Sequence, residues 1–249
     1  MISSRFPVCA DRFDHRDMRC KIEKTPLKEF VDLRIWASPV EDQLSLGSCT
    51  GQAVIGAYEL LLRKQQPEKF IDLSRLFVYY NARLVEGDEF VGSDNGAYVR
   101  NAIKAAREYG ACAEALWPYT IKNFAIAPPV HTYEDAKRRI IKNYYRVDDV
   151  DAMLDALNAG YPIVASMDVY ESFDDLETSS DYILKMPQGY DQLIGGHALT
   201  LVGYDLQKKL MLARNSFGSD WCMDGYFWIP FAYIKNYFMD NWIFDIELI

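Results

Sequence analysis

The feature that most constrains this fold is a helix that is apolar on nearly every face. From Cys49 to about Gln66 the sequence contains good helix formers and no proline before Pro67. Its apolar residues fall on all sides of the helix: Ala53, Val54, Ile55, Ala57, Tyr58, Leu60, Leu61 and Leu62. Such a helix is stable only when other elements cover it from every direction. We therefore expect the rest of the chain to fold around it.

A cysteine opens this helix. Gly47 and Ser48 precede Cys49, and Ser48 is placed to act as the N-cap. In the first turn, a thiol lies among unpaired backbone N–H groups at the positive end of the helix dipole, and both favour the thiolate. Cys49 is therefore a candidate nucleophile. A lone cysteine at a helix start is more often an ordinary small buried residue, so its partners must decide.

Two candidate partners lie far downstream. His197 heads a run of residues with strand character, and Asn215 follows the next such run. If residues 208–214 pair with residues 199–206 as an antiparallel hairpin, His197 and Asn215 lie at the same end of the sheet. The asparagine can then orient the imidazole.

Together, Cys49, His197 and Asn215 occur in an order and context that resemble the papain-like cysteine peptidases, in the cytosolic-looking prokaryotic or viral branch. Gln43, six positions before the cysteine, also matches. The similarity runs from Val31 to the C-terminus. It implies that Cys49 is the nucleophile, His197 the base, Asn215 the residue that orients it, and Gln43 the side chain that completes the oxyanion hole. It implies peptide-bond hydrolysis with no metal or cofactor.

The sequence departs from the family pattern at four places. Leu46 stands where the family has a disulfide-forming cysteine, Thr50 where an aromatic residue follows the nucleophile, and Ala97 where a second glycine is usual. Phe217 replaces a tryptophan, although Trp221 is kept. None of these changes removes a proton-transfer group, so they bear on specificity and structural support.

The resemblance implies a two-lobed α+β fold. We expect an N-terminal extension over residues 1–30, a helical lobe over 31–130 that carries the nucleophile, and a β-rich lobe over 131–249 that carries the histidine and the asparagine. The second lobe is expected to be an antiparallel, barrel-like sheet, with the active site in the groove between the lobes. Because the family is usually restrained by an inhibitory prosegment, we expect the short extension to pack along the lobes or partly cover the cleft.

The pattern along the chain predicts the remaining elements. One helix is expected from the Ser74 cap to about Val85, with a stop at Gly87, and the next follows residues 94–98 and ends at Tyr109 and Gly110. Two more are expected over 133–142 and over 150–159, the latter with an Asp151 cap. Strands are expected at 163–169, 197–206, 209–214, 225–229 and 241–249. The acidic stretch 172–195 is expected to be a solvated loop at the cleft, and His131 a surface histidine.

Candidate substrate-binding residues follow from the resemblance. Gly96 and Ala97 match the segment whose backbone pairs with an extended substrate, provided that Ala97 keeps a negative φ; a helix-capping turn explains the same residues equally well. Further positions are expected to line the cleft: Ser166, Gly196, Ala198 and Trp221.

Composition excludes several classes of partner. With 27 Lys and Arg against 36 Asp and Glu, the formal charge of −9 argues against nucleic acid or an anionic membrane as a partner. The N-terminus lacks a signal-peptide core, and no run approaches the ~18 apolar residues of a membrane span. Five cysteines without a framework spacing favour a reducing, cytoplasmic location, which includes a viral or phage context. Cys9, His15 and Cys20 match no zinc pattern, so a surface segment is favoured over a metal site.

Three alternatives accompany the predicted peptidase activity. Acyl transfer or exopeptidase action on the same triad would give amine incorporation or one-residue trimming. A catalytically silent peptide-binding module predicts loss of a triad member, and none is lost. A chance placement of Cys49, His197 and Asn215 is disfavoured by the matching context around all three.

Overall fold

The computed structural model describes residues 6–68 and 70–248. Its α-helices are α1 Cys49–Gln65, α2 Arg75–Glu86, α3 Val99–Glu108, α4 Val130–Ala136, α5 Val150–Asn158 and α6 Phe231–Tyr237. Its 3-10 turns are η1 Arg34–Trp36, η2 Asp88–Phe90, η3 Glu114–Leu116, η4 Ile121–Asn123 and η5 Glu171–Thr178. Its strands are β1 Phe30–Asp32, β2 Arg139–Arg146, β3 Ile163–Tyr170, β4 Leu193–Asp205, β5 Leu210–Arg214, β6 Tyr226–Pro230 and β7 Phe238–Leu248.

The strands form one antiparallel sheet in the order β2-β7-β3-β4-β5-β6, and β1 pairs with β4 beside that path. The predicted hairpin is confirmed, because Thr200 lies opposite Arg214 and Asp205 opposite Leu210. The α+β class is also confirmed. In the part of the chain that the structure describes, however, β2 and β6 end the sheet without pairing to each other, so the barrel-like sheet is open.

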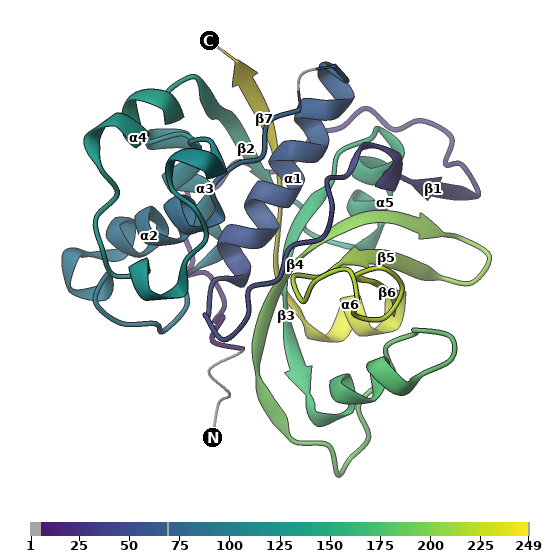
Figure 1. The fold of residues 1–249 in the computed structure, drawn as a ribbon. Helices are drawn as coiled ribbons and strands as arrows, with labels where there is room; N and C mark the ends of the chain where they lie inside the picture. Colours follow the sequence, from purple (N-terminus) through teal and green to yellow (C-terminus); the bar gives the residue numbers. More distant parts are fainter. Residues whose placement is uncertain (1–5, 69, 249) are drawn as a thin grey trace.

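The predicted central helix is α1. Every residue from Cys49 to Leu62 is buried, and α1 lies between α2–α4 on one side and the sheet on the other (Figure 1). The Thr200 hydroxyl of β4 donates to the carbonyl of Ala53 at 2.9 Å. This contact fixes the helix against the strand that carries His197.

Two helix predictions were wrong in detail. The helix expected over 133–142 ends at Ala136, and β2 begins at Arg139. Ile141 there pairs with Ile246 of β7, so pairing with a strand from the far end of the chain overrides the local helical pattern. In α5 the cap is Asp149, whose carboxylate accepts from the N–H of Ala152, instead of Asp151.

One loop prediction also needs correction. The stretch 172–195 is not wholly a solvated loop, because η5 buries Phe173 and Leu176 and β4 begins at Leu193. His131 is exposed as expected, but it lies within α4.

The N-terminal segment crosses the molecule before the first strand. We call residues 6–20 the strap. At its start, Pro7 bridges to Gly196 of β4, and at its end Arg19 bridges to Arg146 of β2. The chain then continues to β1. Among the described residues, no helix combines the length and apolarity that a membrane crossing requires.

Candidate active site

Cys49 is the first residue of α1, as predicted, and its side chain is completely buried. Ser48 occupies the N-cap position, but its side chain makes no capping bond. Its hydroxyl lies 2.6 Å from the hydroxyl of Tyr119, which donates to the carbonyl of Gln43 at 2.8 Å. Ser48 is therefore the N-cap residue, as predicted, but its hydroxyl links the start of α1 to the turn that precedes it instead of capping the helix.

His197 and Asn215 lie together at one end of the β4–β5 hairpin. The imidazole Nε2 and the amide Oδ1 are 2.7 Å apart, and both side chains are buried. The ring of Phe217 lies 5.2 Å from the imidazole, centroid to centroid. Trp221 packs edge-on against Phe217 at 5.5 Å. Aromatic side chains thus shield the His–Asn pair from water, with Phe217 at the place of the usual tryptophan.

The nucleophile candidate lies beside the strand of the histidine. The Cys49 sulfur is hydrogen-bonded to the backbone of Ala198, the residue that follows His197. Cys49 and Ala198 also belong to one apolar cluster. The structure therefore brings the first turn of α1 against the His197 end of β4.

Gln43 is completely buried and held at three points. Its side-chain Nε2 donates to the carbonyl of Leu46 at 3.0 Å, and its Oε1 accepts from the hydroxyl of Ser216 at 2.6 Å. Its backbone N–H donates to the carbonyl of Ser216 at 2.8 Å. An amide NH₂ carries two donors, and the bond to Leu46 uses one of them. Ser216 was not singled out from the sequence, although its position directly after Asn215 was a signal.

The turn before Cys49 is tied to the next loop by a carboxylate. Both oxygens of Asp94 accept from the N–H of Gly47, at 3.1 and 3.0 Å, and Oδ1 also accepts from the hydroxyl of Tyr79 at 2.5 Å. Leu46, at the position of the family's disulfide cysteine, is buried. Hydrogen bonds through Asp94 thus connect the two loops that flank the cysteine. Sequence reasoning missed this residue.

The strap covers this region. The N–H of Val8 donates to the carbonyl of Gly196, and the N–H of Gly196 donates to the carbonyl of Phe6, each at 3.0 Å. Pro7 lies between these bonds, and a Cβ atom at either Gly47 or Gly96 would stand 2.8 Å from its Cγ. The strap therefore passes between the Gly96 loop and the β4 strand, across the turn that leads to Cys49.

The predicted substrate-binding residues fall into two groups. Gly96 has a φ of 77°, and Ala97 keeps the negative φ that a backbone contact needs. Both, with Gly196, lie at the strap. Ser166 of β3 is completely buried opposite Ala198 in the sheet, and Trp221 stacks on Phe173 at 6.0 Å.

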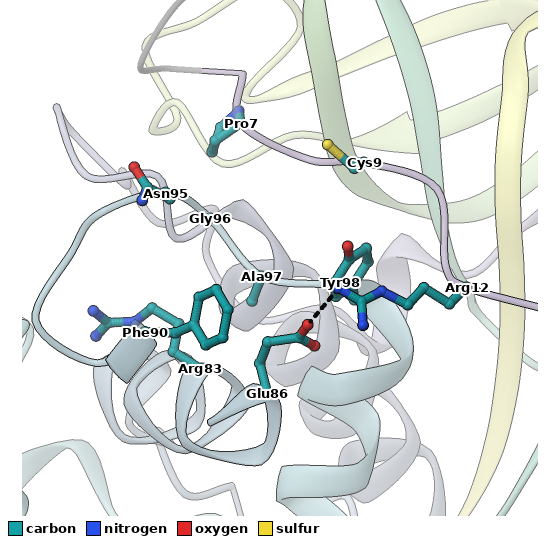
Figure 2. Close-up of a pocket in the computed structure, with 10 residues that line it drawn as sticks. All are labelled: Pro7, Cys9, Arg12, Arg83, Glu86, Phe90, Asn95, Gly96, Ala97 and Tyr98. Carbon is teal, nitrogen blue, oxygen red and sulfur yellow. Dashed lines mark ion pairs between the residues drawn. The ribbon is translucent and has the colours of Figure 1, made fainter. Parts of the chain in front are cut away.

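A pocket of about 160 Å³ lies where the strap passes the Gly96 loop (Figure 2). The strap contributes Cys9 and Arg12 to it, and Glu86 of α2 pairs with Arg12 at 3.3 Å. Ala97 points into it (Figure 2). Among the residues described, no group of three or more His, Cys, Asp or Glu side chains is placed to hold a metal ion.

Burial changes the ionisation of the candidate nucleophile. Loss of contact with water raises the pKa of the Cys49 thiol to about 12, and hydrogen bonds from the backbone of Ala198 and Thr50 only partly oppose this. The expectation of a lowered thiol pKa is therefore wrong for the covered protein. The helix N-terminus is present, but desolvation outweighs it.

Comparison with known proteins identifies the family. Residues 27–239 match the family model of the papain family cysteine proteases. The chain is 35% identical to an uncharacterized peptidase C1-like protein of Acanthamoeba polyphaga mimivirus, over 97% of the chain and 87% of that protein.

Solved structures show the same relationship. Xylellain, a cysteine protease from Xylella fastidiosa, superposes with a TM-score of 0.89 at 33% identity, over 98% of this chain and 97% of that one. Digestive procathepsin L 3 of Tenebrio molitor shares the fold at a TM-score of 0.70 and 20% identity, over 92% and 74% of the two chains. The chain therefore belongs to the papain family and is a cysteine peptidase, a hydrolase whose substrates are peptides or proteins.

Proposed function

We propose that peptide hydrolysis in this protein runs through Cys49, His197 and Asn215, with Gln43 and the Cys49 N–H as the oxyanion hole. The observation that carries the proposal is the buried His197–Asn215 pair, 2.7 Å between Nε2 and Oδ1, on the strand whose next residue contacts the Cys49 sulfur. We further propose that the lobes predicted over 31–130 and 131–249 form the two walls of the site.

The chemistry needs one proton carrier and one nucleophile. His197 takes the proton of the Cys49 thiol, and the thiolate attacks the carbonyl carbon of the substrate. When the tetrahedral intermediate collapses, the C–N bond breaks and His197 gives its proton to the leaving amine. His197 then takes a proton from water, whose oxygen attacks the thioester and releases the acid and the free thiol.

Asn215 and Gln43 serve this cycle without exchanging protons. The neutral amide oxygen of Asn215 accepts a hydrogen bond from the Nε2–H of His197 and so orients the ring. Unlike a carboxylate, it does not draw the proton off the imidazolium. Gln43 is held by Ser216 and Leu46, so its amide is in place before the oxyanion forms. A donor that needs no reorganisation at the moment of reaction stabilises the transition state most effectively.

The strap sets the resting state. It covers the first turn of α1 and leaves Cys49 inaccessible, with a thiol pKa raised to about 12. A peptide cannot occupy the path between Gly96 and Gly196 while Phe6 to Val8 lie there. We therefore propose that the covered form is latent and that displacement of the strap precedes catalysis.

The test compares alkylation and hydrolysis in matched variants. Iodoacetamide labelling of Cys49, mapped by peptide mass spectrometry between pH 5 and 9, is measured in the wild type, His197→Ala and His131→Ala. Because His131 is an exposed histidine on α4, it is the control. We expect His197→Ala to slow labelling at pH 6 and to lower kcat by about 10³-fold or more, as does Cys49→Ser. Equal labelling and hydrolysis in the two histidine variants would refute the triad.

A further inference from the structure

The strap places a phenyl ring in an aromatic pocket beside the proposed base. Phe6 is only 3% exposed. Its ring centroid lies 5.7 Å from that of Phe173, 5.5 Å from that of His197 and 6.3 Å from that of Phe217. Edge-on packing of this kind adds to the apolar area that the rings bury. The pocket therefore has the size and chemistry of a large apolar side chain.

The wall opposite the base belongs to the body of the protein and is held by contacts that do not involve the strap. Phe173, from η5, stacks on Trp221 at 6.0 Å with an interplanar angle of 18°, and packs edge-on against Phe227 at 5.6 Å. Phe217 packs edge-on against Trp221 as well. Since these contacts do not involve Phe6, departure of the strap would uncover a preformed cavity. We call Phe173, Phe217 and the face of His197 the aromatic pocket.

The position of the pocket relates it to one side of the scissile bond. In the proposed mechanism His197 gives its proton to the leaving amine, so the residue that carries this amine lies beside the imidazole. Because Gly96 and Ala97 match the family segment whose backbone pairs with an extended substrate, we place the acyl side of the substrate toward this loop. The strap passes the same landmarks, with Phe6 at His197 and Pro7 at Gly96. The aromatic pocket is thus on the amine side.

We propose that the aromatic pocket selects substrates with an aromatic or bulky apolar residue directly after the scissile bond, and that Phe173 determines this specificity. The inference rests on the proposed function and adds the class of substrate. A phenyl side chain at this position would again cover the faces of Phe173 and Phe217 that Phe6 covers in the latent form. Glycine would leave them in water, and aspartate would lose its hydration without gaining a partner.

The kinetic test uses quenched fluorescent peptides that differ only in the residue after the scissile bond, which is Phe, Leu, Gly or Asp. The full-length wild type is compared with Phe173→Ala, Phe173→Leu and the control Phe70→Ala, whose ring lies on Arg63 and is 43% exposed. We expect the wild type to prefer Phe over Gly by about tenfold or more in kcat/KM. In Phe173→Ala this ratio should fall toward one. Phe173→Leu should keep part of the preference.

A purely structural role of Phe173 would lower cleavage of all four peptides equally, and that result, or a wild type that ignores the residue after the bond, would overturn the proposal. If Phe173→Ala fails to melt cooperatively, the ratio in Phe173→Leu decides.

A binding readout separates this inference from the proposed function. Phe6→Ala empties the pocket of its ring, so phenylalanine amide should bind and change the fluorescence of Trp221, which stacks on Phe173. Glycine amide should not, and Phe6→Ala combined with Phe173→Leu should bind at least severalfold more weakly. Binding without hydrolysis of any peptide would refute the proposed function and keep the pocket. Hydrolysis without saturable, Phe173-dependent binding would refute the pocket.

Discussion

The two halves of the strap are held in different ways. The first half, Phe6 to Val8, is apolar and joins β4 through two backbone hydrogen bonds with Gly196. The second half, Asp11 to Asp17, is charged and is held by side chains. Asp11 accepts from the indole N–H of Trp242 at 2.9 Å, and Asp17 pairs with Arg100 at 2.8 Å.

The first half of the strap makes contacts that resemble those of a substrate, and the second half makes the contacts that hold the strap on the protein. Backbone pairing with Gly196 and an apolar ring beside His197 are contacts that any extended peptide could make. The charged contacts lie away from the cysteine and have no counterpart in a substrate. The second half should therefore control how often the cleft opens, and the first half should show what fills it. Changes to the site and changes to the anchor should give opposite effects on activity.

The largest effect is expected from the site itself. Gln43→Ala removes one oxyanion donor and should lower kcat by about 10²- to 10³-fold with a small change in KM. Ser216→Ala keeps that donor but releases Oε1, so it should cost less, about tenfold. Steady-state kinetics on one peptide measure both. If Ser216→Ala costs as much as Gln43→Ala, or Gln43→Ala raises only KM, Gln43 does not act on the transition state.

A smaller effect, on stability, is expected where Asp94 joins the turn before Cys49 to the Gly96 loop. Asp94→Ala removes the acceptor for Gly47 and Tyr79, both next to the cleft. Leaving these donors without an acceptor should lower the free energy of unfolding by about 1–3 kcal/mol. Asp94→Asn keeps one carbonyl oxygen and should lose less. Thermal and urea unfolding of the two variants measure this difference, and equal stabilities would mean that the carboxylate does not hold the loop.

Local sequence patterns correctly predicted the elements whose burial follows from the apolar pattern of their own residues. The all-round apolar surface of Cys49 to Leu62 required a central helix, and the alternation around 199–214 required a hairpin. The segment 137–142 was mispredicted because its partner strand lies about a hundred residues away at the other end of the chain. The sequence order of Cys49, His197 and Asn215 suggested the site, and the N-terminal extension was expected to pack along the lobes or partly cover the cleft. Complete burial of the thiol could not be predicted from these patterns, and so the direction of its pKa shift was missed.

Loosening the anchor should raise activity, opposite in sign to the site variants. Asp17→Asn removes the charge that faces Arg100 in a mostly buried pair, so the strap should open more often. We expect kcat/KM of the full chain and the labelling rate of Cys49 at pH 7.5 to rise by about tenfold. Asp14→Asn is the matched control, because Asp14 pairs within the strap with Arg16, which is largely exposed. If both variants behave alike, the Arg100 pair does not retain the strap.

The smallest effect concerns pH. Burial and the nearby carboxylate of Asp240 raise the pKa of Asp11 to about 6, against hydrogen bonds from the Arg100 backbone and Trp242 and the charge of Arg100. Arg146 also faces this pair, 2.8 Å from Asp240. The docked strap therefore binds the Asp11 proton more tightly than the released strap, whose carboxyl has the ordinary value near 3.8. This contribution to docking is complete below pH 3.8 and is lost as the pH rises through 6.

Hydrogen exchange at the amides of Val8 and Gly196 reports this opening directly. After correction for intrinsic exchange rates, both amides should be protected severalfold better at pH 5 than at pH 7.5. In Asp11→Asn, whose side chain is neutral at both values, this difference should shrink while the amides of α1 remain unchanged. The Asp14→Asn variant should keep the wild-type difference, since the Asp14 carboxylate pairs with Arg16 of the strap itself. Protection that increases with pH would show that the charges of Arg100 and Arg146 outweigh burial and keep Asp11 ionised in the docked strap.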